Sequence, residues 1–293
     1  MKKLQNSTQK YNKIFFFKPQ FKFKKYSQIN NIYIEIKALT KRLYIQTYRK
    51  PSIFISGIIQ PLLWMILFGA LFQNAPIDLI NQYNIKYGQF LSPGIIIFTA
   101  FTGSINTGLP IIFDREFGFL NRLIVAPLES RYSLIISLII YIWATTSIQL
   151  IIIIIFSIYW FQHIFNINVI LQILKITTFI IINIANFSIY MGFILPGHIE
   201  FLACIFIINL PILFSSTALA PLSFMPYWLQ IFVSINPLTY AIEITRNICF
   251  QNHINTIKTV WFTLNMNIVI YSLIIISLIS FIIIKNIIEY RFD

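Results

Sequence analysis

Long apolar stretches, each of about 20 residues or more, recur along this 293-residue chain and dominate what it can fold into. A helix that crosses the hydrocarbon core of a bilayer needs about 20 predominantly apolar residues. We therefore expect an all-α membrane protein with six transmembrane helices. The predicted spans are residues 52–72, 89–112, 132–161, 168–195, 201–220 and 260–284.

The composition excludes a soluble protein. Only 11% of the residues are charged, and the mean hydropathy is +0.76. A soluble domain carries about 25% charged residues, because water must solvate its surface. The two cysteines, Cys204 and Cys249, form no CxxC motif and no cluster with histidine. We therefore predict no metal site, no catalytic residue and no disulfide framework.

Basic residues are concentrated at the N-terminus. Residues 1–50 contain 13 of the 22 lysines and arginines and a single acid, Glu35. A basic tail ahead of the first apolar segment is typical of the positive-inside rule and of attraction to anionic lipid headgroups. The expected partner is the lipid bilayer and not nucleic acid. Residues 1–50 are predicted as a basic tail with an amphipathic interfacial helix, and residues 51–293 as one six-helix membrane domain.

The interfacial helix is predicted from an apolar stripe in residues 29–49. Four apolar residues follow one another at helical spacing, and lysines and arginines lie off the stripe, so the helix can lie in the headgroup plane with its apolar face toward the membrane. Pro51 ends it before the first span. The stripe consists of Ile32, Ile36, Leu39 and Leu43.

The distribution of basic residues also predicts the orientation. With the N-terminus inside, 18 lysines and arginines fall on the inner side and three on the outer side. An excess of lysine and arginine on the inner side sets the orientation of membrane proteins. Both termini are therefore expected inside, which six spans require.

The predicted inner loop between the second and third spans is dense in charge. Asp114 and Glu116 would lie near the start of a helix, where its dipole favours acids, and Pro127 would end it. The spacing predicts one short amphipathic helix over 113–127, and an ordinary positive-inside loop is the alternative. Its apolar stripe is Phe113, Phe117, Leu120 and Ile124.

Segment 221–259, before the last span, is apolar but rich in proline. Proline removes a helical hydrogen bond, so two short re-entrant or interfacial helices are expected there in place of a seventh span. Glu243 and Arg246 are three residues apart and could pair on a helix surface. The segment could form an outer gate, or a capped interfacial helix pair that contacts no substrate. Its interrupting residues are Pro221, Pro226 and Pro237.

Together the two segments resemble the membrane subunits of the type-2 ABC exporter family. The family's first motif, D/E-R-E-x-G-x-L-x-x-L-x-x-x-P, is matched by Asp114, Arg115, Glu116, Gly118, Leu120, Leu123 and Pro127. Its second, P-L-x-x-x-P-x-W-L followed by N-P-x-T-Y-x-x-E-x-x-R, is matched at 221–229 and 236–246, including Pro221, Pro226, Trp228, Pro237, Tyr240, Glu243 and Arg246. The resemblance covers roughly residues 30–290.

The resemblance implies the transmembrane subunit of an ATP-driven exporter. The 113–127 segment would be the coupling helix, with Arg115 and Glu116 contacting a separate ABC ATP-binding subunit. A second copy of the chain would complete the translocation pathway, as a homodimer. The chain has no G-x-x-x-x-G-K-[S/T] loop, so it is not itself an enzyme and needs no cofactor, and ATP and magnesium would bind the partner.

The isoleucine-rich, A/T-codon composition is similar to that of the version encoded in red-algal plastid genomes. A plastid membrane is the expected location, and a bacterial plasma membrane is the alternative. Neither the composition nor the motifs indicate the transported substrate.

Two other functions need features that the sequence lacks. A membrane-bound transferase acting on a lipid-linked substrate would need clustered aspartates for magnesium, and no DxxD or DxxxD occurs. An ion-coupled secondary transporter would place paired ionisable groups near the membrane midplane, and no such pair occurs in the six predicted spans.

Overall fold

The computed structural model of the chain describes residues 28–73, 86–125, 130, 132–161, 166–250, 256–259, 261 and 263–292. The predicted basic tail up to residue 27 and the predicted helix terminator Pro127 lie outside the described residues.

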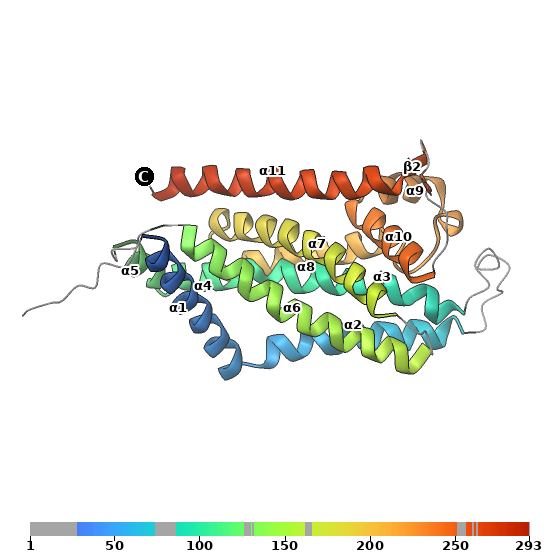
Figure 1. Ribbon diagram of the computed structural model, residues 1–293, viewed down its shortest axis with the longest axis horizontal. Helices are drawn as coiled ribbons and strands as arrows, with labels where there is room; N and C mark the ends of the chain where they lie inside the picture. Colours follow the sequence, from blue (N-terminus) through green and yellow to red (C-terminus); the bar gives the residue numbers. More distant parts are fainter. Residues whose placement is uncertain are drawn as a thin grey trace, which may run out of the picture.

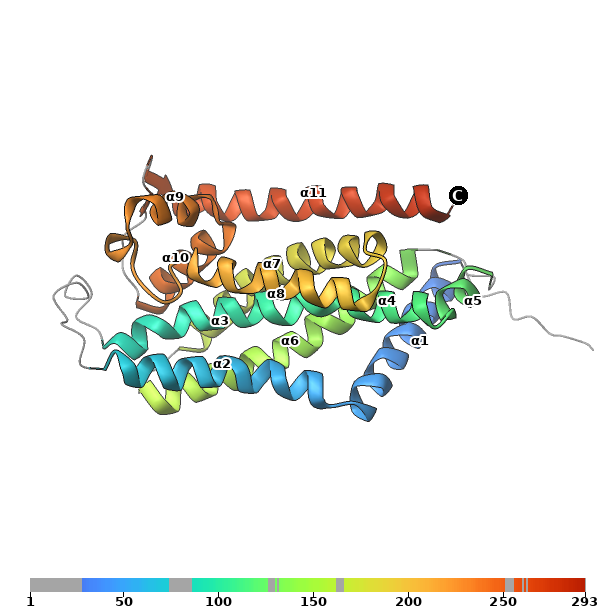
Figure 2. The ribbon, with the colours of Figure 1, turned by 180° about the vertical axis from the view of Figure 1, so that it is seen from behind.

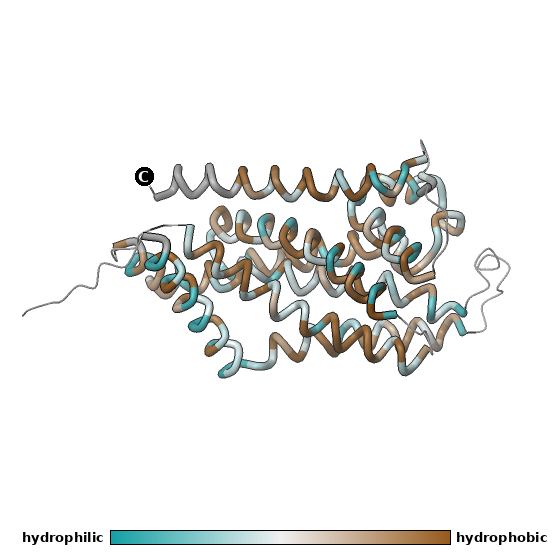
Figure 3. Tube along the Cα trace, in the orientation of Figure 1, coloured by the Kyte–Doolittle hydropathy of each residue, from teal (hydrophilic) through white to brown (hydrophobic). Residues whose placement is uncertain are grey.

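The core of the structure is a bundle of long helices that run side by side (Figure 1). Their residues are predominantly apolar, and Figure 3 shows this as brown stretches along most of each helix. Within the described part of the chain, five helices are long and apolar enough to cross a membrane. They are α2 (Ser52–Leu71), α3 with its continuation (Tyr87–Glu116), α6 (Tyr132–Phe161), α7 (Ile167–Ile194) and α11 (Met266–Phe292).

The second of these five is one long rod made of three elements. Helix α3 (Tyr87–Ile105) passes through the 3₁₀ turn η2 (Asn106–Gly108) into α4 (Leu109–Glu116). Thirty residues at the α-helical rise extend about 45 Å, which exceeds the hydrocarbon core of about 30 Å. The rod is therefore longer than the hydrocarbon core is thick.

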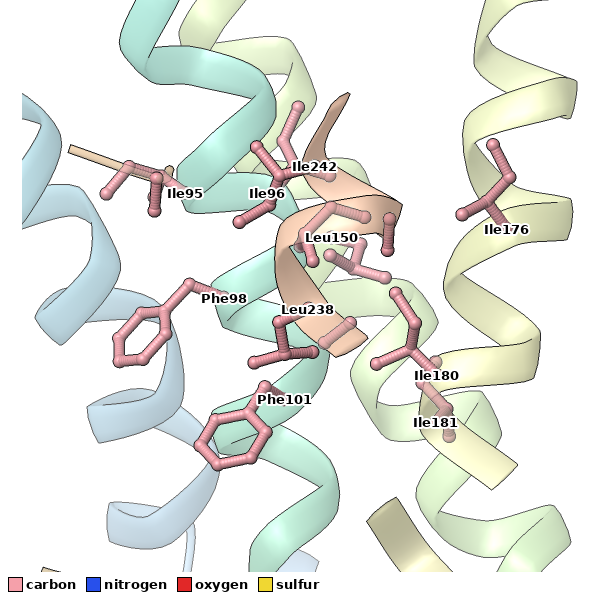
Figure 4. Packing of buried hydrophobic residues seen from close by; sticks show 14 of the residues in the cluster. Ile95, Ile96, Phe98, Phe101, Leu150, Ile176, Ile180, Ile181, Leu238 and Ile242 are labelled. Carbon is pink, nitrogen blue, oxygen red and sulfur yellow. The ribbon is translucent and has the colours of Figure 1, made fainter. Parts of the chain in front are cut away.

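Helix α3 lies at the centre of the bundle. In the apolar stretch of this rod 83% of the residues are buried, against 11% of those in α2 and 11% of those in α11. Isoleucine and phenylalanine side chains of α3 pack between α2, α6, α7 and α10 (Pro237–Phe250). Figure 4 shows this packing with Ile95, Ile96, Phe98 and Phe101 of α3, Leu150 of α6, Ile180 and Ile181 of α7, and Leu238 and Ile242 of α10.

The predicted fifth span is shorter than the sequence indicated. Helix α8 (His198–Phe214) has 17 residues, which gives a length of about 25 Å, and it ends six residues before the predicted boundary at 220. The chain leaves the helix at Ser215, whose carbonyl oxygen accepts a hydrogen bond of 2.8 Å from the side-chain Nδ2 of Asn236. That contact satisfies a helix-terminal carbonyl and fixes the turn.

Short elements follow α8 at one end of the bundle. The turn η3 (Leu222–Phe224) precedes α9 (Tyr227–Ile235) and α10, so the proline-rich segment forms two short helices, as expected from its sequence. The strands β1 (Thr256–Lys258) and β2 (Thr263–Asn265) then pair antiparallel, with Ile257 opposite Leu264. The prediction that the last span begins at 260 is therefore wrong. Threonine and branched residues favour strands, and α11 starts only at Met266.

Helices α1 (Gln28–Arg49) and α5 (Phe119–Val125) lie at the other end, where α11 also finishes (Figures 1 and 2). The predicted apolar stripe of α1 packs in part against protein. Leu43 is 4% exposed and packs with Ile135 and Leu138 of α6. The other three residues of the stripe are half-buried. The large apolar side chains of α1 left exposed are Tyr33, Ile34, Tyr44, Ile45 and Tyr48. Helix α6 therefore covers at least part of the stripe that the sequence predicted to face lipid.

Candidate functional site

The predicted coupling segment is bent and does not form one helix. Helix α4 ends at Glu116 and α5 begins at Phe119. Between them Gly118 has a φ of +69°, a conformation that residues with a Cβ adopt at a cost. The Gly118 N–H donates to the Arg115 carbonyl oxygen at 3.1 Å. A glycine in this conformation is a common helix terminator. Asp114 and Glu116 therefore lie at the end of a helix, and the prediction that they lie near its start is wrong.

Asp114 connects the segment to α1. Its carboxylate forms an ion pair with the Arg42 guanidinium, which also stacks 3.7 Å from the centroid of the Phe119 ring. Arg42 therefore contacts both sides of the bend, the end of α4 and the start of α5. Arginine suits this position because its flat guanidinium can pair with a carboxylate and stack on an aromatic ring at once.

Arg115 connects the segment to the end of α7. Its guanidinium donates to the carbonyl oxygens of Gly192 at 3.4 Å, Phe193 at 3.3 Å and Pro196 at 2.7 Å, and also to that of Leu195. The last carbonyls of a helix have no partner within the helix, and a cation is favourable at this end of the helix dipole. Arg115 therefore holds the C-terminus of α7 against the end of α4.

Glu116 connects the segment to the start of α8. Its carboxylate accepts hydrogen bonds from the backbone N–H of His198 at 2.8 Å and contacts the His198 ring Nδ1 at 2.7 Å. His198 is the first residue of α8, so the carboxylate satisfies an N–H group that has no partner within the helix. An acid is also favourable at this end of the helix dipole.

The leucines of the motif seat α5 on the bundle. Leu120 is 6% exposed and packs in a cluster with Leu43 of α1, Ile135 of α6 and Phe193 of α7. Leu123 is half-buried. Among the described residues of the first motif, Asp114, Arg115, Glu116 and Leu120 thus contact other parts of this chain, and Gly118 forms the bend.

The solvent-facing surface of the segment consists of residues between the motif positions. Phe117 is 79% exposed and Val125 is 85% exposed, and Asn121 and Arg122 are exposed as well. The helical spacing had predicted Phe117 in a membrane-facing stripe, and it did not single out Val125. Gly118, directly after Phe117, could have shown that a helix ends here. Beyond such a bend, residues at helical spacing no longer lie on the same face as those before it.

At the opposite end, the second motif forms a capped pair of helices. Pro226 immediately precedes α9, Pro221 precedes η3, and Pro237 is the first residue of α10. The Asn236 side chain accepts from the Leu238 N–H at 3.0 Å, and the Tyr240 hydroxyl donates to the Ser234 carbonyl oxygen at 2.6 Å. Trp228 on α9 is 63% exposed, together with its neighbours Tyr227 and Phe232.

Arg246 is buried in this second motif. It is 2% exposed and forms the ion pair with Glu243 that their spacing allowed. Its Nη2 donates to the Thr217 carbonyl oxygen at 2.9 Å, and its guanidinium lies 3.8 Å from the centroid of the Phe90 ring on α3. Arg246 thereby connects α10 to the turn after α8 and to the central rod.

Comparison with known proteins identifies the family. A family profile described as ABC-2 type transporter matches residues 34–250, which include both motifs. The chain belongs to the ABC-2 type transporter family. This confirms the resemblance drawn from the two motifs.

Three curated relatives cover nearly the whole ABC-2 chain, and each is named "Putative transport permease ycf38". The protein from Porphyra purpurea is 46% identical over 263 residues, 88% of this chain and 90% of the relative. The protein from Cyanophora paradoxa is 47% identical over 262 residues, again 88% and 90%. The protein from Pyropia yezoensis is 45% identical over 285 residues, 94% and 96%. The ABC-2 chain is thus a multi-pass integral membrane protein of the plastid, and a permease-type subunit of a transporter.

Proposed function

We propose that this chain is the transmembrane subunit of an ATP-driven exporter, and that a separate ABC ATP-binding subunit drives it through the 113–127 segment. The observation that supports this most is the bend at Gly118. Three consecutive charged residues just before it, Asp114, Arg115 and Glu116, each contact a different helix of the bundle.

The exposed side of α5 is the proposed docking surface for the ATP-binding subunit. Phe117 and Val125 present apolar side chains there, and Arg122 adds a positive charge. Exposed apolar groups beyond the membrane are typical of protein interfaces. ATP and magnesium would bind the partner, because this chain has no phosphate-binding loop.

Motion would spread from the bend to three helices. A displacement of α5 reaches α1 through Asp114, the end of α7 through Arg115 and the start of α8 through Glu116. A close-packed interior transmits a local displacement, because it has little free volume to absorb it. The same displacement acts along α3, whose far end contacts Arg246 through Phe90.

The proposed membrane arrangement has six spans. Helix α8, with 17 residues, would be the fifth span, since a bilayer can thin around a short span. The predicted topology places α1, α5 and the end of α11 on the side of the ATP-binding subunit. Helices α2 and α11 are only 11% buried in one copy, which leaves faces for lipid and for a second copy in the proposed homodimer.

The test is co-purification of an ATP-binding subunit with variants of the docking surface. Phe117→Ser combined with Val125→Ser removes exposed apolar groups without touching the packed core. We expect this variant to insert and to melt as the wild type does, but to lose the ATP-binding subunit and ATP-dependent export. Tyr227→Ser combined with Phe232→Ser, on exposed α9, is the matched control and should retain both. Full retention of the ATP-binding subunit by the first variant would refute the proposed docking surface.

A further inference from the structure

A cavity of about 430 Å³ lies at the corner between α1 and α2, where these helices face α4 and α6. This volume is within the range of small-molecule sites, which is about 300–1,000 Å³. Its lining includes residues of α1 from Leu43 to Lys50 and residues of α2 as far as Gln60. Since Gln60 is eight residues into α2, the cavity extends about 12 Å along that helix.

Two cations stand in the exposed part of the lining, at Arg49 and Lys50, which we call the mouth of the cavity. Neither has an acidic partner within the described chain. Asp114 is the one acid among the lining residues, and its carboxylate is already bound to Arg42. Two exposed cations without an acidic partner among the described residues attract an anionic group.

The lining combines apolar and polar side chains. Ile53, Phe54 and Phe113 are the apolar part that the argument uses, and threonines and Gln149 line the cavity as well. Gln149 is 5% exposed, and its Nε2 donates to the Phe54 carbonyl oxygen at 3.1 Å. Its Oε1 is buried and has no hydrogen-bond partner in the described part of the chain.

Two glycines make room for this amide. A Cβ added to Gly57 would lie 2.5 Å from Nε2 of Gln149, and one added to Gly103 would lie 3.1 Å from its Oε1. The amide is therefore held closely by α2 and α3, while its oxygen lacks a donor. A buried acceptor without a donor is unfavourable, and here it lies packed against the backbones of α2 and α3.

We propose that this cavity binds an anionic amphiphile. The acidic head, a phosphate, sulfate or carboxylate, lies at Arg49 and Lys50. The apolar body lies against Phe54 and Phe113. Neither a soluble anion nor a neutral lipid uses both the charged mouth and the apolar walls. The site does not depend on the transport proposal, because binding is measured on this chain alone.

The test uses the purified full chain in neutral detergent, with lysophosphatidic acid as the probe. This molecule has a phosphate, a free hydroxyl and one acyl chain. We expect measurable binding by native mass spectrometry, and much weaker binding of lysophosphatidylcholine, whose head carries no net charge. Glycerol 3-phosphate, the same head without the chain, should not compete at equal concentration. Equal binding of the two lipids, or full competition by the free head, would overturn the proposal.

Charge variants locate the head. Arg49→Gln combined with Lys50→Gln should weaken binding about 25-fold, roughly fivefold for each cation. Lys37→Gln combined with Lys41→Gln makes the same charge change on exposed residues of α1 that do not line the cavity, and should leave binding unchanged. The same loss in both double variants would show nonspecific attraction and overturn the site.

One further variant tests the interior while both cations remain. Ile53 is 55% exposed and lines the cavity, so Ile53→Trp adds volume there without displacing core side chains. We expect Ile53→Trp to abolish binding. Unchanged affinity in Ile53→Trp would place the ligand elsewhere and refute the assignment.

Discussion

Gly118 sets the bend between α4 and α5, and replacing it with alanine tests whether that bend matters. Its φ of +69° costs a residue with a Cβ at least about 1 kcal/mol. A Cβ added at Gly118 would meet nothing within 4 Å beyond its chain neighbours, so the cost comes from the backbone alone. Alanine also favours an uninterrupted helix over glycine by about 1 kcal/mol.

Both effects of Gly118→Ala act in the same direction. Together they shift the balance from the bent segment toward a straight α4–α5 helix by about 2 kcal/mol, or about 30-fold. A straight helix would withdraw Leu120 from its cluster and Phe119 from Arg42. We therefore expect the variant to insert normally, but with faster amide exchange in α5 and weaker co-purification of the ATP-binding subunit.

Gly118→Asn is the matched control. Asparagine adds a larger side chain than alanine, but it adopts positive φ more readily and favours helix less. We expect amide exchange in α5 and co-purification close to those of the wild type. If asparagine perturbs the segment more than alanine does, side-chain volume and not backbone conformation governs the bend, and the reasoning is refuted. A wild-type result for Gly118→Ala would refute it too.

Two further predictions concern buried side chains at opposite ends of the bundle. Leu120→Ala should destabilise the packing of α5 against the bundle by about 3 kcal/mol, because it leaves a cavity in a packed cluster. Faster amide exchange in α5 measures this loss. If exchange rises no more than in Leu123→Ala, which truncates a half-buried leucine, the prediction is contradicted. Arg246→Gln should destabilise the protein by about 3 kcal/mol, because Glu243 loses its partner. Arg246→Lys should restore only part of the melting temperature, since an ammonium cannot pair and stack as a guanidinium does. Full recovery with lysine would show that charge alone is needed.

The sequence predicted the long helices well because their signal is local. The length of an apolar run can be counted directly in the sequence. Helices α2, α6 and α7 accordingly begin and end within one residue of the predicted boundaries. The prolines likewise predicted the two short helices α9 and α10. The end of α8 was missed because Asn236, more than 20 residues later, fixes the turn at Ser215.

The partners of the charged motif could not be predicted from spacing. Arg115 and Glu116 contact groups about 80 residues later in the chain, at the turn between α7 and α8. The family resemblance implied that both contact another subunit, and the structure shows in addition the contacts that both make within this chain. An apolar stripe is similarly ambiguous, because the pattern in α1 does not distinguish lipid from α6 as the surface that covers it. Gly118 was the one local signal of the bend.

The enclosed position of α3 determines how one copy of the subunit can deform. This helix is surrounded by α2, α6, α7 and α10, and its extension α4 leads directly to the bend. A push along its axis cannot slide it past four tightly interdigitated neighbours without breaking their close packing. The subunit should therefore tilt as a single solid block, and the passage for cargo should open at its outer boundary with the neighbouring copy, not through its middle.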